Sequence, residues 1–120
     1  MVDRWILFGF LAVFLLAFTL AGCKSAAPPK PLEQLTAQER QGHNVYQQRC
    51  VVCHSDRTDT KLAAPPLLGV YKKQYLPSGA AATDERVSAT ILHGRGMMPA
   101  LGNAIDQQQL DDLLAYLHTL

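Results

Sequence analysis

The sequence has few aromatic residues outside its amino-terminal segment, and it has no excess of charge of either sign. All four Phe and the single Trp lie within the first 22 of the 120 residues, so the remainder has only four Tyr as its aromatics. Eleven Lys and Arg balance ten Asp and Glu. A chain of this length forms one small domain. Because large aromatic side chains usually dominate core burial, their absence indicates that another group fills part of the interior.

Two further absences exclude classes of protein. The sequence has no basic stripe interleaved with aromatic residues, so the electrostatic footprint of a nucleic-acid-binding protein is missing. Three cysteines are an odd number, which rules out a fully paired disulfide framework. No run of alternating apolar and polar residues demands a strand, and there is no internal repeat. We therefore expect an all-α domain in which each cysteine has its own role.

The amino-terminal segment has the layout of an export signal. Arg4 precedes an uninterrupted apolar run that ends at Ala17, and small residues then lead to Cys23. Residues 20–23 resemble the lipobox of bacterial lipoproteins, in which cleavage precedes the Cys and that Cys is lipidated. The resemblance implies a signal peptide at 1–22 and a lipid anchor at Cys23. The alternative is an uncleaved membrane-spanning helix, for which the apolar run is at the lower limit of length.

A Pro-rich stretch follows the predicted anchor. Residues 24–35 contain three prolines and no apolar period, which predicts an extended tether of up to roughly 37 Å at about 3.1 Å per residue. The chain is thus expected to comprise a signal peptide at 1–22, a lipid-anchored tether at 23–35 and a folded domain at 36–120. Lys24 after the anchor slightly favours the outer over the inner membrane, and in both cases the domain faces the periplasm.

Three helices are predicted in the folded domain. The first begins with a capping box at Thr36, and its apolar face runs into a pair of cysteines. A second helix is capped by Thr83 and stops at Gly94. The last begins with another capping box at Asp106. It carries an apolar stripe formed by Leu110, Leu113, Leu114 and Leu117.

The chemistry of the sequence is concentrated between Cys50 and His54. Cys50 and Cys53 lie on one side of a helical turn, where each thiol can add across a vinyl group of haem b to form a thioether. His54 can then offer an imidazole nitrogen to the iron, and this spacing is the attachment signature of c-type haem. Three other interpretations compete with it: a structural zinc site, which needs a second Cys pair, a thioredoxin-like redox pair, which needs a βαβ context, and a structural disulfide.

With these motifs, the region 36–120 resembles the class I monohaem cytochrome c family. The family has an aromatic helix before the haem motif, a Pro-containing loop after it, a Met-Pro ligand loop and an aromatic residue on its terminal helix. The corresponding residues are Gly42 with Tyr46, Pro65, Met98 before Pro99, and Tyr116. The resemblance implies a small cytochrome c fold of three to four helices around one covalently attached haem c. It also implies that the first and last helices cross near Gly42.

The resemblance implies the ligands of the iron as well. The family places its sixth ligand immediately before the Pro, so we expect Met98 to bind the iron and Met97 to be a packing residue. His93 is a less favoured alternative ligand. A His and a Met together raise the reduction potential relative to stronger donor pairs. The carbonyl of Pro65 is expected to accept a hydrogen bond from the free ring nitrogen of His54 and to fix its tautomer.

The expected function is that of an electron carrier without catalytic residues. The resemblance implies one-electron transfer between redox protein partners, which the sequence does not identify, with no small-molecule substrate. Two other functions stay open: an electron-entry subunit of an oxidoreductase complex, and a haem enzyme or gas sensor with an open iron site. Four cations either form a rim that steers an acidic partner or belong to a solvated face: Arg57, Lys61, Lys72 and Lys73.

Overall fold

The structure, a computed structural model, describes residues 27–120, so the predicted signal peptide and Cys23 lie outside the described residues. The described part contains three α-helices and two short 3-10 turns joined by loops. In chain order they are η1 (Leu32–Gln34), α2 (Ala37–Arg49), η2 (Val70–Lys72), α3 (Asp84–His93) and α4 (Gln107–Leu117). No β-strand occurs between residues 27 and 120. The predicted all-α fold is confirmed.

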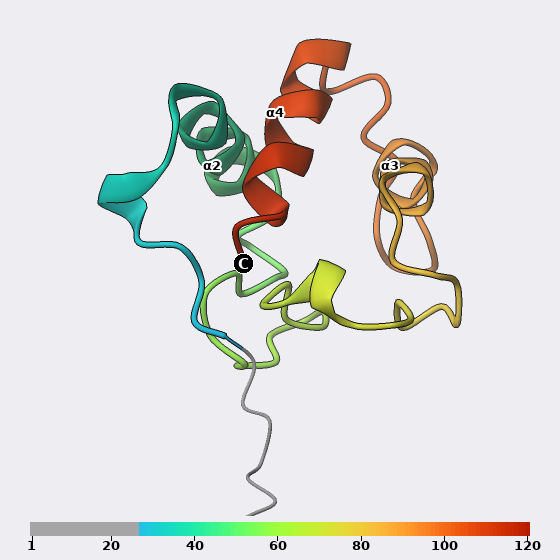
Figure 1. Cartoon of the computed structure of the whole chain (residues 1–120). Helices are drawn as coiled ribbons and strands as arrows, with labels where there is room; N and C mark the ends of the chain where they lie inside the picture. The colour runs from blue at the N-terminus through green and yellow to red at the C-terminus, as the bar shows by residue number, and fades with distance from the viewer. Residues whose placement is uncertain (1–26) are drawn as a thin grey trace, which may run out of the picture.

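Helices α2 and α4 cross beside each other, and α4 lies between α2 and α3 (Figure 1). The crossing is close because residue 42 is a glycine. A Cβ atom on Gly42 would overlap the backbone carbonyl of Asp112 and would lie 2.7 Å from the Cβ of Tyr116. The rings of Tyr46 and Tyr116 pack beside this contact with their centroids 6.0 Å apart, and both are almost completely buried. The predicted crossing near Gly42 is therefore confirmed.

The helix ends follow local signals in the sequence. Thr36 Oγ1 accepts a hydrogen bond from the Glu39 N–H at 3.2 Å, while the Glu39 carboxylate accepts one from the Thr36 N–H at 2.6 Å. Asp106 and Gln109 form the same reciprocal pair at the start of α4. These bonds satisfy N–H groups that have no partner within the helix. At the carboxyl-terminal end of α3, Gly94 is the C-cap and has a φ of 72°, so the predicted helix stop is confirmed.

The core consists of aliphatic and Tyr side chains and contains no Phe or Trp from the described residues. Its members come from all three helices, from η2 and from both flanking segments: Leu35, Val45, Tyr46, Val70, Val87, Ile91, Ile105, Leu110, Leu113, Tyr116, Leu117 and Leu120. Between residues 27 and 120, no helix is both long enough and apolar enough to cross a bilayer.

The Pro-rich segment differs from the extended tether predicted for it, because its second half lies against the domain. The Lys30 N–H donates to the Thr119 carbonyl at 2.8 Å, and Lys30 Nζ forms an ion pair with Glu39 at 2.7 Å. The hydrogen bond from Lys30 holds the pKa of Glu39 below its usual range. Leu35 is only 3% exposed. The packed part of the domain thus begins before the predicted boundary at residue 36.

Candidate functional site

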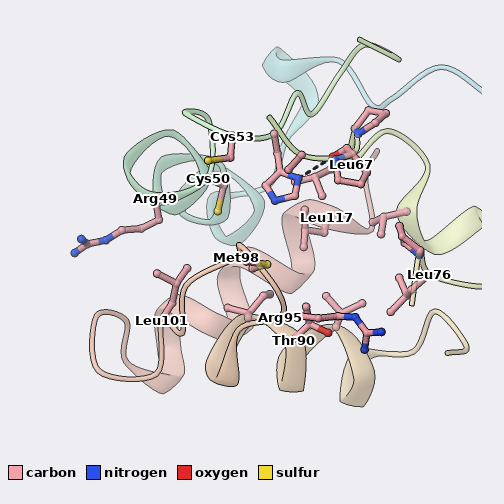
Figure 2. A pocket seen from close by; sticks show the side chains of 18 of the residues that line it. Arg49, Cys50, Cys53, Leu67, Leu76, Thr90, Arg95, Met98, Leu101 and Leu117 are labelled. Atoms are coloured by element: carbon pink, nitrogen blue, oxygen red, sulfur yellow. Dashed lines mark hydrogen bonds between the residues drawn. The ribbon is translucent and has the colours of Figure 1, made fainter. Parts of the chain in front are cut away.

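A cavity of about 450 Å³ opens between the end of α2, helix α3 and the carboxyl-terminal part of α4 (Figure 2). Its walls are mostly aliphatic and include Leu67, Val70, Leu76, Val87, Ile91, Leu101, Leu113 and Leu117. The same cavity is lined by Cys50, Cys53, His54 and Met98. Together with Pro65, which also lines the cavity, the fold thus brings five predicted site residues from three separate segments to one apolar space.

Helix α2 ends directly at the cysteine pair. Cys50 is its C-cap, and the Cys50 carbonyl accepts from the N–H groups of Cys53 at 3.0 Å and His54 at 2.9 Å. This turn places both thiols at one end of the cavity (Figure 2). Burial, with a smaller effect from Cys53, raises the pKa of the Cys50 thiol to about 11. A thioredoxin-like pair requires the opposite, a thiol whose pKa is lowered, so the surroundings of Cys50 disfavour that interpretation.

The donor set of the cavity fits a covalently attached haem. Cys50 and Cys53 are not joined in a disulfide, and two free thiols at this spacing can each form a thioether. The imidazole of His54 and the thioether of Met98 line the same apolar space, and both groups are ligands that bind haem iron. For the competing zinc interpretation, which usually needs four ligands, residues 27–120 offer no group of three or more His, Cys, Asp or Glu side chains arranged to hold a metal ion.

His54 is held from two sides. Its Nδ1 lies 2.7 Å from the Pro65 carbonyl oxygen, which leaves Nε2 as the nitrogen available to a metal. Because a carbonyl can only accept, this contact fixes the proton on Nδ1 and orients the ring. The backbone carbonyl of His54 accepts from the Tyr46 hydroxyl at 2.7 Å. Burial, together with the Asp56 carboxylate, raises the pKa of Tyr46 to about 12, so this hydroxyl stays a donor.

The roles of the Tyr46 and Tyr116 hydroxyls were not predicted from the sequence. The Tyr116 hydroxyl donates to Asp56, and burial together with that carboxylate raises the pKa of Tyr116. The signal was present in the sequence, since a buried Tyr hydroxyl usually finds a partner. Which acceptor it meets, however, depends on the path of the loop after the cysteines. Helices α2 and α4 thus both hold residues 54–56 in place.

Met98 stands on a tight loop after α3. The Arg95 N–H donates to the Met98 carbonyl, and the Met98 N–H donates to the Arg95 carbonyl, each at 3.0 Å. A Cβ atom on Gly94 would lie 2.5 Å from the Met98 carbonyl oxygen. Glycine at position 94 is therefore needed for the close approach of this loop as well as for the end of α3. The half-buried Met98 side chain lines the cavity, and Figure 2 shows it between Cys50 and helix α3.

Three other side chains near the site differ in their exposure to solvent: those of Met97, His93 and His43. Met97 is 97% exposed, so its predicted role as a packing residue is wrong. Both methionines border the cavity, but the side chain of Met97 is open to solvent whereas that of Met98 is half-buried. His93 is exposed at the end of α3 and is not part of the cavity wall. His43 is half-buried, and its ring centroid lies 5.0 Å from that of Tyr116.

Two of the four cations considered for a rim make contacts elsewhere. Arg57 and Lys72 donate from their side chains to backbone carbonyls of residues 27–30. Lys61 is exposed, and Lys73 lines the cavity. The first two cations therefore fasten the amino-terminal segment to the domain.

The chain is similar to known haem proteins over most of its length. Residues 37–117 match the protein family described as "Cytochrome C oxidase, cbb3-type, subunit III". Two similar proteins are the cbb3-type cytochrome c oxidase subunits CcoP of Azospirillum brasilense, 33% identical over 91 residues, and of Azospirillum sp. (strain B510), 33% identical over 87 residues. These alignments cover 70% and 66% of this chain but only 29% and 27% of the two subunits. Cytochrome c6 of Bryopsis maxima is 27% identical over 78 residues, which are 62% of this chain and 83% of that protein.

These similarities agree with the chemistry of the cavity. The family match includes both the cysteine pair and the loop that carries Met98. The chain spans less than a third of the length of the oxidase subunits that it matches, whereas it matches most of the small cytochrome c6. The protein therefore belongs to the cbb3-type cytochrome c oxidase subunit III family and is an electron-transferring c-type cytochrome with covalently bound haem c.

Proposed function

We propose that this protein is a membrane-tethered cytochrome that carries single electrons between protein partners outside the cytoplasmic membrane. The observation that supports it most is the meeting of His54 and Met98 at one apolar cavity that has both cysteines at one end. When bound there, haem c supplies an iron that takes up or releases one electron. His54 and Met98 would hold this iron as its protein ligands, and a substrate would then have no position at which to bind it.

The residues of the chain would keep this site unchanged during transfer. Cys50 and Cys53 fix the group by covalent bonds, and the Pro65 carbonyl fixes the orientation of the His54 imidazole. The aliphatic walls limit access of water, which also tunes the reduction potential. None of these roles requires a general acid or base, so the site functions without moving a proton.

The test is optical spectroscopy of the purified full-length protein. The oxidised protein is expected to show the weak far-red band of a Met-to-iron bond, and the reduced protein is expected not to bind carbon monoxide readily. Ready binding of carbon monoxide without displacement of Met98 would instead indicate a haem enzyme or a gas sensor with an open iron site.

A second candidate is an electron-entry subunit docked to an oxidase complex. The family match and the two CcoP proteins favour it. Purification from native membranes in mild detergent separates the two candidates. Co-elution with a large oxidase at stoichiometric yield would support the docked subunit, whereas elution alone would support a mobile carrier between partners.

The tether can be tested at Cys23, on which the lipobox-like residues 20–23 place the lipid. We expect Cys23→Ser to prevent lipidation, so that most of the haem-stained protein leaves the membrane fraction or accumulates unprocessed. Cell fractionation followed by haem-stained gels measures this. Unchanged membrane retention would support an uncleaved spanning helix instead. The wild-type protein is expected in the outer-membrane fraction, and its recovery only with inner membrane would contradict the preference drawn from Lys24.

A further inference from the structure

The wall of the cavity carries three cations and no carboxylate. Arg49, Lys73 and Arg95 line it, and no Asp or Glu is among the lining residues. An apolar space whose charged side chains all have one sign fits a ligand with an apolar body and an anionic end. Haem c is such a ligand, because its two propionate carboxylates lie on the side of the macrocycle opposite the two thioether bonds.

The position of the cysteines distinguishes Arg49 from Arg95 as partners of the carboxylates. Cys50 and Cys53 lie together at one end of the cavity (Figure 2). Arg49 directly precedes Cys50, and its side chain points away from the cavity in Figure 2. Arg95 extends its guanidinium at the other end, on the side of Leu76 (Figure 2). The carboxylate edge of a haem attached at the cysteines therefore faces the end that holds Arg95.

The backbone of Arg95 is held by hydrogen bonds, while its guanidinium forms no ion pair among the described residues. Its N–H and carbonyl form the pair of hydrogen bonds with Met98 that closes the ligand loop. Within residues 27–120, its guanidinium takes part in neither of the two ion pairs, which join Lys30 to Glu39 and His118 to Asp84. A guanidinium presents a planar fork of N–H groups that matches a carboxylate in a bidentate manner.

We propose that Arg95 binds a propionate carboxylate of the haem and thereby raises the reduction potential. This inference rests on the proposed attachment at Cys50 and Cys53. An unpaired carboxylate favours the oxidised, more positive iron by Coulomb attraction, and a bound guanidinium offsets that negative charge. Arg95 is thus a positioning residue that holds the cofactor and does not ligate the iron.

The test is Arg95→Gln in the full-length, haem-loaded protein. The equilibrium constant for reduction is expected to fall roughly three- to tenfold, the upper end being about 59 mV for one electron. The propionate bending band in the resonance Raman spectrum is expected to shift as well. Arg95→Lys keeps the charge but loses the bidentate fork, so it should retain most of the potential and still shift the band.

Arg49→Gln is the matched control, because it removes the same charge from a residue beside the cysteines whose side chain points away from the cavity. It is expected to change the reduction constant less than about twofold, as a screened surface charge does, and to leave the propionate band in place. Equal effects of Arg49→Gln and Arg95→Gln would overturn the inference, and so would a band shift seen only in Lys73→Gln. Either result would overturn only the role of Arg95. The proposed function would still hold if the wild-type protein showed the spectra of His/Met ligation. A wild type without attached haem would defeat both.

Discussion

Gly42→Ala is expected to lower the free energy of unfolding of the haem-loaded protein by about 2 kcal/mol or more. Alanine favours a helix over glycine by ~1 kcal/mol, which works in the opposite direction. The overlap decides the sign, because the new Cβ would meet the Asp112 carbonyl, which is part of the rigid backbone of α4. The two helices would have to separate where Tyr46 and Tyr116 are now buried. Denaturation in guanidinium chloride, followed by far-UV circular dichroism, measures the change.

Gln41→Ala is the control for this prediction. Residue 41 is exposed on the same helix, one position before the crossing, so its truncation is expected to change stability by less than about 0.5 kcal/mol. If Gly42→Ala were as stable as Gln41→Ala, the close crossing of α2 and α4 would be wrong.

Met98→Ala is expected to leave the haem attached and to change its electronic state. Attachment depends on the cysteines, so the variant should stay coloured. The far-red band should disappear, and the reduction potential should fall by more than about 60 mV, a change of more than tenfold in the equilibrium constant. The potential should fall because a soft thioether ligand favours the reduced iron, and the variant lacks this ligand. Optical spectra and a potentiometric titration measure both effects.

Met97→Ala is the matched control, since it removes an adjacent Met that is 97% exposed. It should retain both the band and the potential. If Met97→Ala lost the band and Met98→Ala retained it, the assignment of the sixth ligand would be wrong.

The helices were predictable because their signals are local. A capping box such as Thr36 with Glu39 joins residues three apart, so its bonds form wherever the chain enters a helix. The crossing at Gly42 depends on residues far apart in sequence, and it came instead from the family resemblance. The aromatic-poor composition correctly indicated an interior without Phe or Trp.

Contacts of the loops and of the amino-terminal segment were beyond the sequence. The bond from Tyr46 to the His54 carbonyl requires the fold of the turn after α2. Lys30 looked like part of a solvated, Pro-rich stretch, yet it meets Thr119 at the other end of the described chain. The different exposure of Met97 and Met98 follows from a loop closed by backbone bonds, which side-chain type alone does not encode.

If Cys23 carries a lipid, the docking of the amino-terminal segment limits the distance between that lipid and the domain. Lys72 Nζ contacts the Ala27 carbonyl at 3.3 Å, so the chain is already held to the domain at that residue. Only four residue steps separate Ala27 from Cys23, and even a fully extended chain spans no more than roughly 14 Å over that interval. With a lipid on Cys23, the domain would search a thin layer at the membrane surface. Partners embedded in the same membrane would then meet it at a high effective concentration.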